Sequence, residues 1–300
     1  MDVGSNTVHL LIADSNGRKV APVDDQSTRL RLGEDVARCG HFQPEKVTLA
    51  IETMQAYAER AARSGAKTIC LLGTQAVRAA ANGNQFASDV EQELSLPLRV
   101  ISPSTEAQLG YLGTTLDVPE RDAHLVVDIG GGSTQLLLAK GGATTFVGSL
   151  AGIGSVTLPA RSIHHDPPRE AEREHMDLTI RQALGILAHP DGGHVRPRFG
   201  VIIGGAGRRI RRAGRLGPKE PLVRSWVQRM ADAALAASTE MMDVFGAVRP
   251  EDADIVRTGA LVLRHVMDAF DLQHCYVSDN GIREGAVLAL ARGEGIPNGD

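Results

Sequence analysis

Two stretches of this chain, Asp2-Val-Gly-Ser-Asn-Thr7 and Asp128-Ile-Gly-Gly-Gly-Ser-Thr134, repeat one pattern. Each has an aspartate, a glycine-rich turn and hydroxyl side chains, and each is followed by an apolar run that is typical of a strand. The two aspartates lie 126 positions apart in a chain of 300 residues, which is close to half its length. The repeat therefore predicts two related halves, each built around the same turn.

The chemistry of the repeated turn suits a phosphate and a metal ion. Because glycine has no Cβ, backbone N–H groups beside it can converge on an anion. Aspartate supplies a hard oxygen ligand for Mg²⁺, so we expect Asp2 and Asp128 to order a metal ion or its water. One such turn alone would be only a tight hairpin, but the matched pair indicates a phosphate held from both sides. The predicted backbone donors are Gly4, Ser5, Asn6, Gly131, Gly132 and Ser133.

Composition excludes several classes of protein. Hydrophobic residues make up 42% of the chain and charged residues 23%, with a net charge of −4, so bulk binding to DNA is not expected. No apolar run approaches the roughly 18 residues of a membrane helix, and no signal peptide is visible. The three cysteines form no CxxC pair and read as reduced, buried thiols of a cytoplasmic protein. Since a turn of this type normally ends a strand, we also expect a chain start upstream of Met1.

The order of the expected elements indicates an α/β protein with a duplicated architecture. Each half begins with a strand meander and continues with alternating helices and strands. Pro119 is the expected boundary, which gives domains at 1–118 and 119–300. Expected strands include 8–13, 19–23, 28–32, 67–72, 98–101, 125–129, 146–150, 201–203 and 275–277. Expected helices include 44–64, 104–116, 155–163, 169–188, 221–245, 257–270 and 282–291, and turns are expected at Asn16-Gly17 and Gly141-Gly142.

Two charged residues stand where strands are expected to pass into helices. Arg78 closes the stretch Gly73-Thr-Gln-Ala-Val-Arg78, and a guanidinium there could bind a phosphate in a forked geometry or form an ordinary surface ion pair. Glu106 lies near the start of a helix, where a glutamate either caps the helix or acts as a general base toward water. The residues alone leave both alternatives open.

Two further motifs have less specific explanations. Gly204-Gly-Ala-Gly207 precedes several arginines and does not have the spacing of a dinucleotide-binding fingerprint. Those arginines form either a solvated helix face or a track for a polyanion. Ser278-Asp-Asn-Gly-Ile-Arg-Glu-Gly285 reads as a turn that enters a helix. No phosphate-binding P-loop and no HExxH zinc motif is present in the sequence.

In their order, these motifs resemble the exopolyphosphatase/guanosine pentaphosphate phosphohydrolase (Ppx/GppA) family of the actin-like ATPase superfamily. The resemblance covers almost the whole chain and includes Arg31-Leu-Gly-Glu34, Asn82 and Tyr111-Leu-Gly113. It implies two ribonuclease-H-like domains with an interdomain cleft. It also implies that Glu106 is the catalytic carboxylate, that Arg78 contacts phosphate and that Asp128 helps to hold Mg²⁺. The chain departs from the family at Gln135, where relatives usually carry glutamate, and at Ala79-Ala80.

We therefore predict a Mg²⁺-dependent exopolyphosphatase that releases terminal orthophosphate from inorganic polyphosphate. Glu106 and Arg78 are its catalytic residues, Asp2 and Asp128 its metal ligands, and another divalent ion or an added monovalent cation is left open. The arginines of the possible polyphosphate track are Arg208, Arg209 and Arg212. The predicted phosphate-binding residues are Gly4, Ser5, Asn6, Thr7, Thr74, Gly130, Gly131, Gly132, Ser133 and Gly205.

The sequence is compatible with three alternative functions. The same site would serve the 5′-phosphate of guanosine pentaphosphate (pppGpp), with a place in the stringent response. Gln135 favours a non-catalytic protein that senses polyphosphate or alarmones such as ppGpp. A kinase of the same superfamily is the third. The expected partners are polyphosphate or an alarmone and a second copy in a homodimer, without DNA or membrane.

Overall fold

The computed structural model describes residues 1–118, 122–187, 196–245 and 248–299. The chain divides into two compact units, Met1–Leu116 with Gly281–Asp300, and Asp117–Asn280. The predicted boundary residue, Pro119, lies outside the described residues. At the C-terminal end the structure differs from the predicted domains, because residues 281–300 belong with the first unit and not with the second.

The first unit has a sheet with the strand order β3-β2-β1-β4-β5. Its central strand, β1, pairs antiparallel with β2 and parallel with β4. The strands are β1 (Asp2–Val3), β2 (Thr7–Ser15), β3 (Val20–Arg29), β4 (Leu71–Gly73) and β5 (Leu98–Val100). The helices are α1 (Leu32–Cys39), α2 (Pro44–Arg63), α3 (Gln75–Ala79), α4 (Gly83–Leu94), α5 (Pro103–Thr114) and α11 (Ile282–Ala291).

The second unit has a sheet with the strand order β10-β11-β9-β6-β7-β8. The strands are β6 (His124–Ile129), β7 (Ser133–Lys140), β8 (Ala143–Ala151), β9 (Phe199–Ile203), β10 (Leu222–Val223) and β11 (His274–Val277). The helices are α6 (Thr157–Ser162), α7 (Glu170–Leu187), α8 (Gly204–Ala213), α9 (Arg224–Ala236) and α10 (Ala253–Ala269). Two 3₁₀ helices, Glu240–Phe245 and Pro250–Asp252, lie between α9 and α10.

Both sheets follow one topology. Read from β8, the second sheet runs β8-β7-β6-β9-β11, which repeats β3-β2-β1-β4-β5 and adds β10 at the edge. In each sheet the first strand is central, its hairpin partners are antiparallel, and the fourth strand is parallel to it. This repeat confirms the predicted α/β class with two ribonuclease-H-like units.

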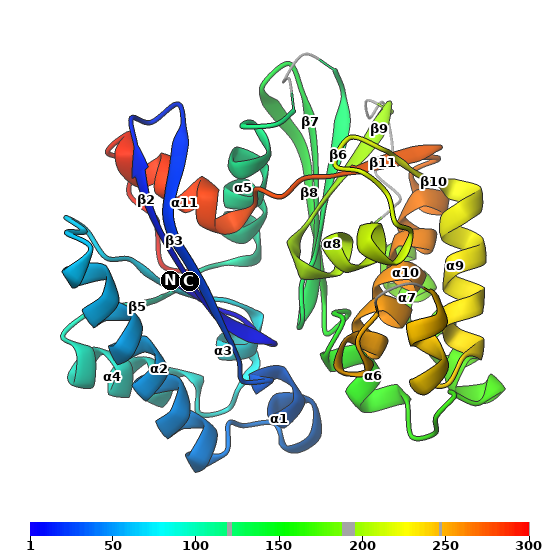
Figure 1. Ribbon diagram of the computed structural model, residues 1–300, viewed down its shortest axis with the longest axis horizontal. Coiled ribbons are helices and arrows are strands. Elements are labelled where there is room, and N and C mark those ends of the chain that lie inside the picture. Colours follow the sequence, from blue (N-terminus) through cyan, green and yellow to red (C-terminus); the bar gives the residue numbers. More distant parts are fainter. Residues whose placement is uncertain (119–121, 188–195, 246–247, 300) are drawn as a thin grey trace. The chain divides into compact units, whose positions relative to one another are not determined.

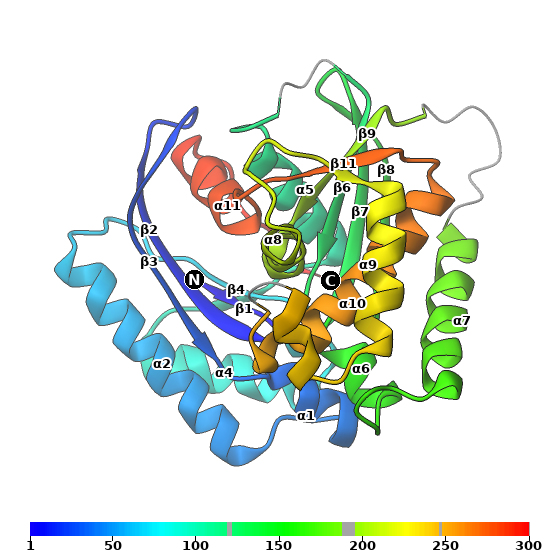
Figure 2. The same cartoon turned by 45° about the vertical axis from the view of Figure 1, so that its right-hand side comes forward.

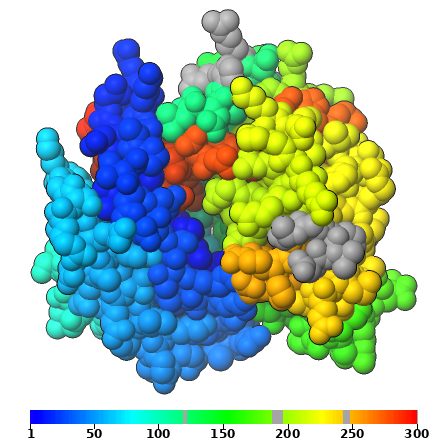
Figure 3. Space-filling model, in the orientation of Figure 1, coloured from blue at the N-terminus to red at the C-terminus, as the bar shows by residue number. Residues whose placement is uncertain are grey.

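The core of the first unit covers both faces of its sheet. In β2, Val8, Leu10 and Ile12 are buried and alternate with less buried residues, as the period of a strand requires. Figure 1 and Figure 2 show α2 and α4 on one side of this sheet and α5 and α11 on the other. In Figure 3 the red atoms of α11 lie beside the blue atoms of β2 and β3, which illustrates how the end of the chain returns to its beginning.

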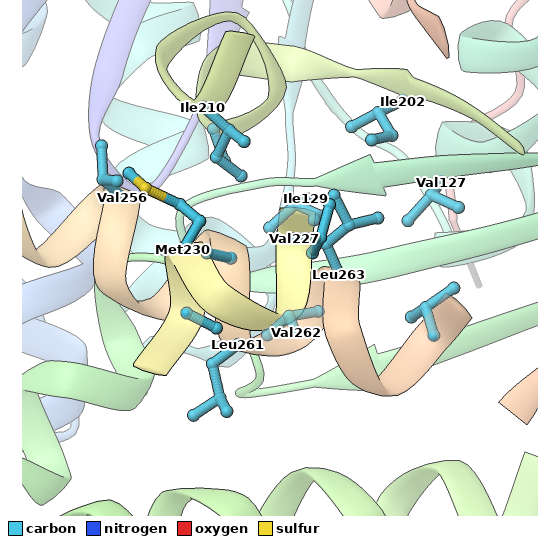
Figure 4. Packing of buried hydrophobic residues seen from close by; sticks show 14 of the residues in the cluster. Val127, Ile129, Ile202, Ile210, Val227, Met230, Val256, Leu261, Val262 and Leu263 are labelled. Atoms are coloured by element: carbon cyan, nitrogen blue, oxygen red, sulfur yellow. The ribbon is translucent and has the colours of Figure 1, made fainter. Parts of the chain in front are cut away.

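The core of the second unit joins its sheet to a layer of helices. Strand β6 is buried along its whole length, which explains its continuous apolar sequence. Figure 4 shows Val127, Ile129 and Ile202 from the strands beside Val227 of α9 and Leu263 of α10. This packing fixes the ends of β6 and β9, from which the candidate site residues of this unit project.

Several predictions of local structure were wrong in detail, among them the strand expected at 67–72, of which only Leu71 and Leu72 belong to β4. The expected strands 19–23 and 28–32 form one continuous strand, β3, because its whole length pairs with β2. The expected helix 221–245 starts later, since Leu222 and Val223 pair with β11 before α9 begins. Of the three free cysteines only Cys275 is buried, and Cys39 is exposed.

Candidate functional site

The first glycine-rich turn joins β1 to β2. The amide of Gly4 donates to the carbonyl of Thr7 at 3.0 Å, which closes the turn. The turn's carbonyls also have partners: Gly33 donates to Ser5 at 2.7 Å, and residues 30 and 31 both donate to Asn6. Within the described part of the chain, the amides of Ser5 and Asn6 donate to no acceptor. The carbonyl oxygens of the turn are therefore hydrogen-bonded within the protein, while the N–H groups of Ser5 and Asn6 have no acceptor there. This is the arrangement that an anion-binding turn requires.

The motif Arg31-Leu-Gly-Glu34 packs against this turn. Arg31 adopts a left-handed conformation with φ of 55°, from which α1 starts. A Cβ on Gly33 would lie 2.6 Å from the Cβ of Ser5, so only glycine allows this approach. The motif's contribution is thus to shape the turn through the backbone.

The second glycine-rich turn, between β6 and β7, has the same construction. Gly130 donates to the carbonyl of Ser133 at 3.0 Å, the counterpart of the bond from Gly4 to Thr7. Its carbonyls accept from the segment after β8: Ser155 donates to Gly130 at 2.9 Å, and residues 156 and 157 donate to Gly131. Among residues that the structure describes, the amides of Gly131 and Gly132 meet no acceptor.

This geometry narrows the list of predicted phosphate donors. Gly4 and Gly130 use their amide hydrogens inside the turns, so these two residues shape the turns and do not offer a donor. The turn amides that donate to no acceptor among the described residues are those of Ser5, Asn6, Gly131 and Gly132.

The hydroxyls at the ends of the turns are held by the next residue but one on the same strand. Thr7 Oγ1 is hydrogen-bonded to His9 Nε2 at 2.6 Å, and Gln135 Nε2 donates to Ser133 Oγ at 2.7 Å. His9 and Gln135 lie opposite the two aspartates in the strand ladders. The sequence analysis assigned no role to His9, although the same 126-residue offset relates it to Gln135.

The two aspartates before the turns have different surroundings. Asp2 Oδ1 is buried, and no donor in the described chain reaches it. Burial raises the pKa of Asp2 to about 6, while the positive charge of Arg283 acts in the opposite direction. Arg283, at the start of α11, also pairs with Asp25 at 2.5 Å, and the sequence analysis gave it no role. Its position beside β1 follows from the return of α11 to the first unit.

Asp128 lies against the start of α8. Its register partner is Ile203, the last residue of β9, so the glycines that follow begin beside it. Gly204 has φ of +85°, and a Cβ there would lie 2.8 Å from Asp128 Oδ1. Gly205 follows in the first turn of α8, where a Cβ would lie 2.8 Å from Arg209 Nη1. The structure thus brings Asp128 next to Gly204, the residue before the predicted Gly205.

The predicted arginine track consists of three residues of α8 with different environments. Arg209 pairs with the buried carboxylate of Asp252 at 2.9 Å and also donates to the carbonyl of Gly205. Arg208 is partly buried, and Arg212 is exposed. Arg209 therefore serves to fasten α8 to the start of α10, a role that its charged sequence neighbourhood did not reveal.

Arg78 and Glu106 meet at one edge of the first sheet. Strands β4 and β5 are parallel neighbours, and the chain leaves both at the same edge to form α3 and α5. Arg78 Nη2 donates to Glu106 Oε2 at 2.7 Å, and Nη1 donates to the carbonyl of Ile101 at 2.6 Å. Close by, the hydroxyl of Thr74 donates to the carbonyl of Val3 at 3.2 Å, so its proton is already used.

Glu106, like Asp2, has a strongly raised pKa. Burial raises its pKa to about 7, Arg78 opposes that shift, and the negative charge of Asp2 adds to it. A carboxyl group with a pKa near neutrality can accept a proton from water and release it again at neutral pH. The end of the first sheet where the chain leaves β4 and β5 therefore combines N–H groups without an acceptor, a buried aspartate and a carboxylate that can accept a proton.

The motif from Ser278 to Gly285 has a structural explanation. Gly281 donates to Glu284 Oε2 at 2.8 Å, which caps α11. A Cβ on Gly285 would lie 1.9 Å from the carbonyl of Leu109, so the glycine allows α11 to pack tightly on α5. This packing is the reason that residues 281–300 belong to the first unit.

Neither a clustered metal site nor a membrane-spanning helix is present among the described residues. No three histidine, cysteine or carboxylate side chains among them are grouped so that they could hold a metal ion. No described helix is both long and apolar enough to cross a membrane.

Comparisons with known proteins agree with this architecture. The family model described as the Ppx/GppA phosphatase family matches residues 11–294. A curated Haemophilus influenzae protein, provisionally named an exopolyphosphatase, is 22% identical over 97% of this chain and 90% of its own length.

Two crystal structures share the fold. An exopolyphosphatase from Cytophaga hutchinsonii is 22% identical, with a TM-score of 0.88 over 99% of this chain and 98% of its own. The Aquifex aeolicus member of the Ppx/GppA family is 24% identical, with a TM-score of 0.81 over 97% and 96% of the two chains. The match of the family model over nearly the whole chain shows that this protein belongs to the Ppx/GppA phosphatase family.

Proposed function

We propose that this protein is an exopolyphosphatase that hydrolyses the terminal phosphoanhydride bond of inorganic polyphosphate. The observation that carries the proposal is Glu106, a buried carboxylate with a pKa near 7 at the sheet edge where Arg78 also lies. The exopolyphosphatase names of the Haemophilus and Cytophaga relatives support polyphosphate as the substrate.

In this proposal the protein contributes position and charge more than covalent chemistry. The amides of Ser5 and Asn6 hold the oxygens of the terminal phosphoryl group. Glu106 accepts a proton from a water whose oxygen attacks the terminal phosphorus. The bridging P–O bond breaks, and orthophosphate and a chain one phosphate shorter leave. In the second unit the amides of Gly131 and Gly132 could bind phosphoryl oxygens in the same way. That the two turns face one another across a cleft stays a prediction.

We propose Mg²⁺ as the cofactor, with Asp2 and Asp128 as its protein ligands. Mg²⁺ is usually held by one or two carboxylates together with the phosphates of a substrate, so a site without three protein ligands is compatible with it. The buried Oδ1 of Asp2, which no donor of the described chain reaches, supports this assignment. The ion would neutralise charge on the terminal phosphoryl group.

The test is phosphate release by the purified protein from short polyphosphate, long polyphosphate and pppGpp, each with Mg²⁺ and with a chelator. We expect Mg²⁺-dependent release from polyphosphate at rates well above those with pppGpp. Preferential release from pppGpp would replace the proposed substrate with the alarmone, because the same site can act on either terminal phosphoanhydride.

Gln135 favours a second candidate, a non-catalytic protein that binds polyphosphate or an alarmone. Its Oε1 is buried and has no partner among the described residues, and the side chain lies opposite Asp128 where the family usually has glutamate. A neutral amide there leaves one negative charge fewer for a metal ion. Tight binding of polyphosphate without turnover in saturating Mg²⁺, together with activity in Gln135→Glu, would establish this candidate.

A further inference from the structure

A segment that follows α11, residues 296–299, is attached to β5, the strand at the edge of the first sheet. The amide of Gly299 donates to the carbonyl of Val100 at 2.6 Å, and Arg99 Nη1 donates to the carbonyl of Ile296 at 2.7 Å. An edge strand leaves backbone groups unpaired, and this segment supplies a donor to one of them. The attachment is therefore made through hydrogen bonds in both directions.

Ile296 anchors the segment in a small apolar cluster. Its side chain is only 2% exposed. The buried members of the cluster come from β4, the start and the middle of α5, and α11; they are Leu72, Ile101, Leu109, Ala286, Ala289 and Ile296. The segment is thus packed against the helix that carries Glu106.

The junction between β5 and α5 provides acceptors to both members of the ion pair at this edge. The carbonyl of Ile101 accepts from Arg78 Nη1 at 2.6 Å, and the carbonyl of Ser102 accepts from the amide of Glu106 at 2.9 Å. The hydroxyl of Ser102 also caps α5 by accepting from the amide of Thr105 at 3.1 Å. A shift of this junction would therefore move the carboxylate and the guanidinium together.

Segment 296–299 touches the same junction. A Cβ on Gly299 would lie 2.9 Å from the amide nitrogen of Ser102 and 3.2 Å from the carbonyl carbon of Ile101. The two backbones are in direct contact there, so the segment limits how far the start of α5 can move. A displacement of about 1 Å at a catalytic group can cost about 100-fold in rate.

We propose that segment 296–299, through Ile296 and its bond to Arg99, is a positioning element for Glu106. It holds the β5–α5 junction in place and so fixes the carboxylate that accepts the proton from water. This inference rests on the proposed function and adds to it a part of the chain that does not touch substrate.

Two arginines of the first unit offer a matched comparison. Arg292 Nε donates to the carbonyl of Gly17 at 2.7 Å, so it also ties the region after α11 to the sheet, but at the β2–β3 hairpin. For Arg99→Met we expect kcat for polyphosphate to fall about 10-fold, with KM changed less than about 3-fold, because only the position of the base is disturbed. Arg292→Met should leave both constants at their wild-type values.

The apolar anchor is tested by truncation and rescue. Ile296→Ala should lower kcat about 10- to 100-fold with little change in KM, and Ile296→Val should restore most of the rate. The control is Ile12→Ala, which truncates a buried isoleucine of β2, a strand that β1 and β4 separate from β5. In fully folded protein, as checked by circular dichroism, this control should keep the wild-type kcat.

Hydrogen exchange of two backbone amides measures the junction without any turnover. The amide of Ile101 donates to the carbonyl of Gly73 at 3.0 Å, and that of Glu106 donates to the carbonyl of Ser102 at 2.9 Å. Both amides should exchange about 10-fold faster when the segment is loosened, because local opening then costs less free energy.

The exchange experiment separates this inference from the proposed function. Faster exchange in Ile296→Ala and Arg99→Met, but not in Arg292→Met, supports the attachment even if the protein hydrolyses no polyphosphate, in which case only the proposed function fails. Unchanged exchange at both amides in Ile296→Ala would overturn the inference. So would a loss of kcat in Arg292→Met equal to that in Arg99→Met.

Discussion

The two glycine-rich turns have the same pattern of backbone hydrogen bonds but differ in the side chains around them. Gly4 and Gly130 close them with the same hydrogen bond, and in both the carbonyls are held from a segment that follows the third strand. The first turn lies in the unit that carries Glu106 and Arg78, whereas the second has Asp128 beside Gly204 of α8. One duplicated scaffold therefore presents two different sets of chemical groups.

The arginines after the fourth strand of each unit sharpen this comparison. Arg78 follows the end of β4 by five residues, and Arg208 follows the end of β9 by five. A similar relation holds between Glu106 in the first turn of α5 and Glu284 in the first turn of α11. Glu284 caps its own helix, while Glu106 bonds to Arg78, so equal positions in the topology have diverged in role.

The largest expected effect distinguishes Glu106 from Glu284. Glu106→Gln should lower the rate of phosphate release about 10²- to 10⁴-fold, because removal of a general base costs that much. Glu284→Gln keeps an acceptor for the amide of Gly281 and should leave the rate within about 3-fold. Initial rates in saturating Mg²⁺ measure both, and near wild-type release by Glu106→Gln would refute the assigned base.

Alanine substitutions at the glycines that contact the two turns compare how much each contact contributes to the free energy of unfolding. A Cβ on Gly154 would lie 2.4 Å from the carbonyl of Gly131, and one on Gly33 would lie 2.6 Å from Ser5 Cβ. Either substitution should lower the free energy of unfolding by about 1–3 kcal/mol, as overpacking does. Urea unfolding measures this, and Gly40→Ala, where nothing lies within 4 Å but φ is +78°, separates the clash from backbone strain.

Asp2 should make stability depend on pH. Its folded pKa of about 6 lies above the ordinary value of 3.8, so the folded state binds the proton more tightly than the unfolded state. The free energy of unfolding should therefore fall as pH rises from about 4 to 6, by about 1–2 kcal/mol. Asp2→Asn should remove that fall. Urea midpoints at several pH values test it, and identical slopes for both proteins would contradict it.

The smallest expected effect concerns the held hydroxyls at the turn ends. Ser133→Ala should cost about 1 kcal/mol, because it leaves the buried amide of Gln135 without its acceptor. Adding Gln135→Met should recover most of that loss, since both polar groups are then gone. A double-mutant cycle by urea unfolding measures the coupling; additive losses would show that the hydrogen bond contributes nothing.

How much the sequence predicted can be judged from particular residues. The turns at Asp2 and Asp128, the hairpin at Asn16-Gly17 and the duplicated α/β order were all predictable, because they depend on local patterns of glycine and on the alternation of apolar residues. The placement of Arg78 and Glu106 near strand ends was predictable for the same reason. Their hydrogen bond was not, since it joins residues 28 positions apart through the pairing of β4 with β5.

The sequence by itself determined the fold class, the repeated turn and the family, since short-range steric preferences and a spacing of 126 residues express them directly. Only the tertiary structure decided that Arg78 pairs with Glu106, that Arg209 pairs with Asp252, and that α11 returns to the first unit. Each of these outcomes depends on which distant groups come within hydrogen-bonding or packing distance. That proximity is a property of the folded chain, and no local pattern of residues encodes it.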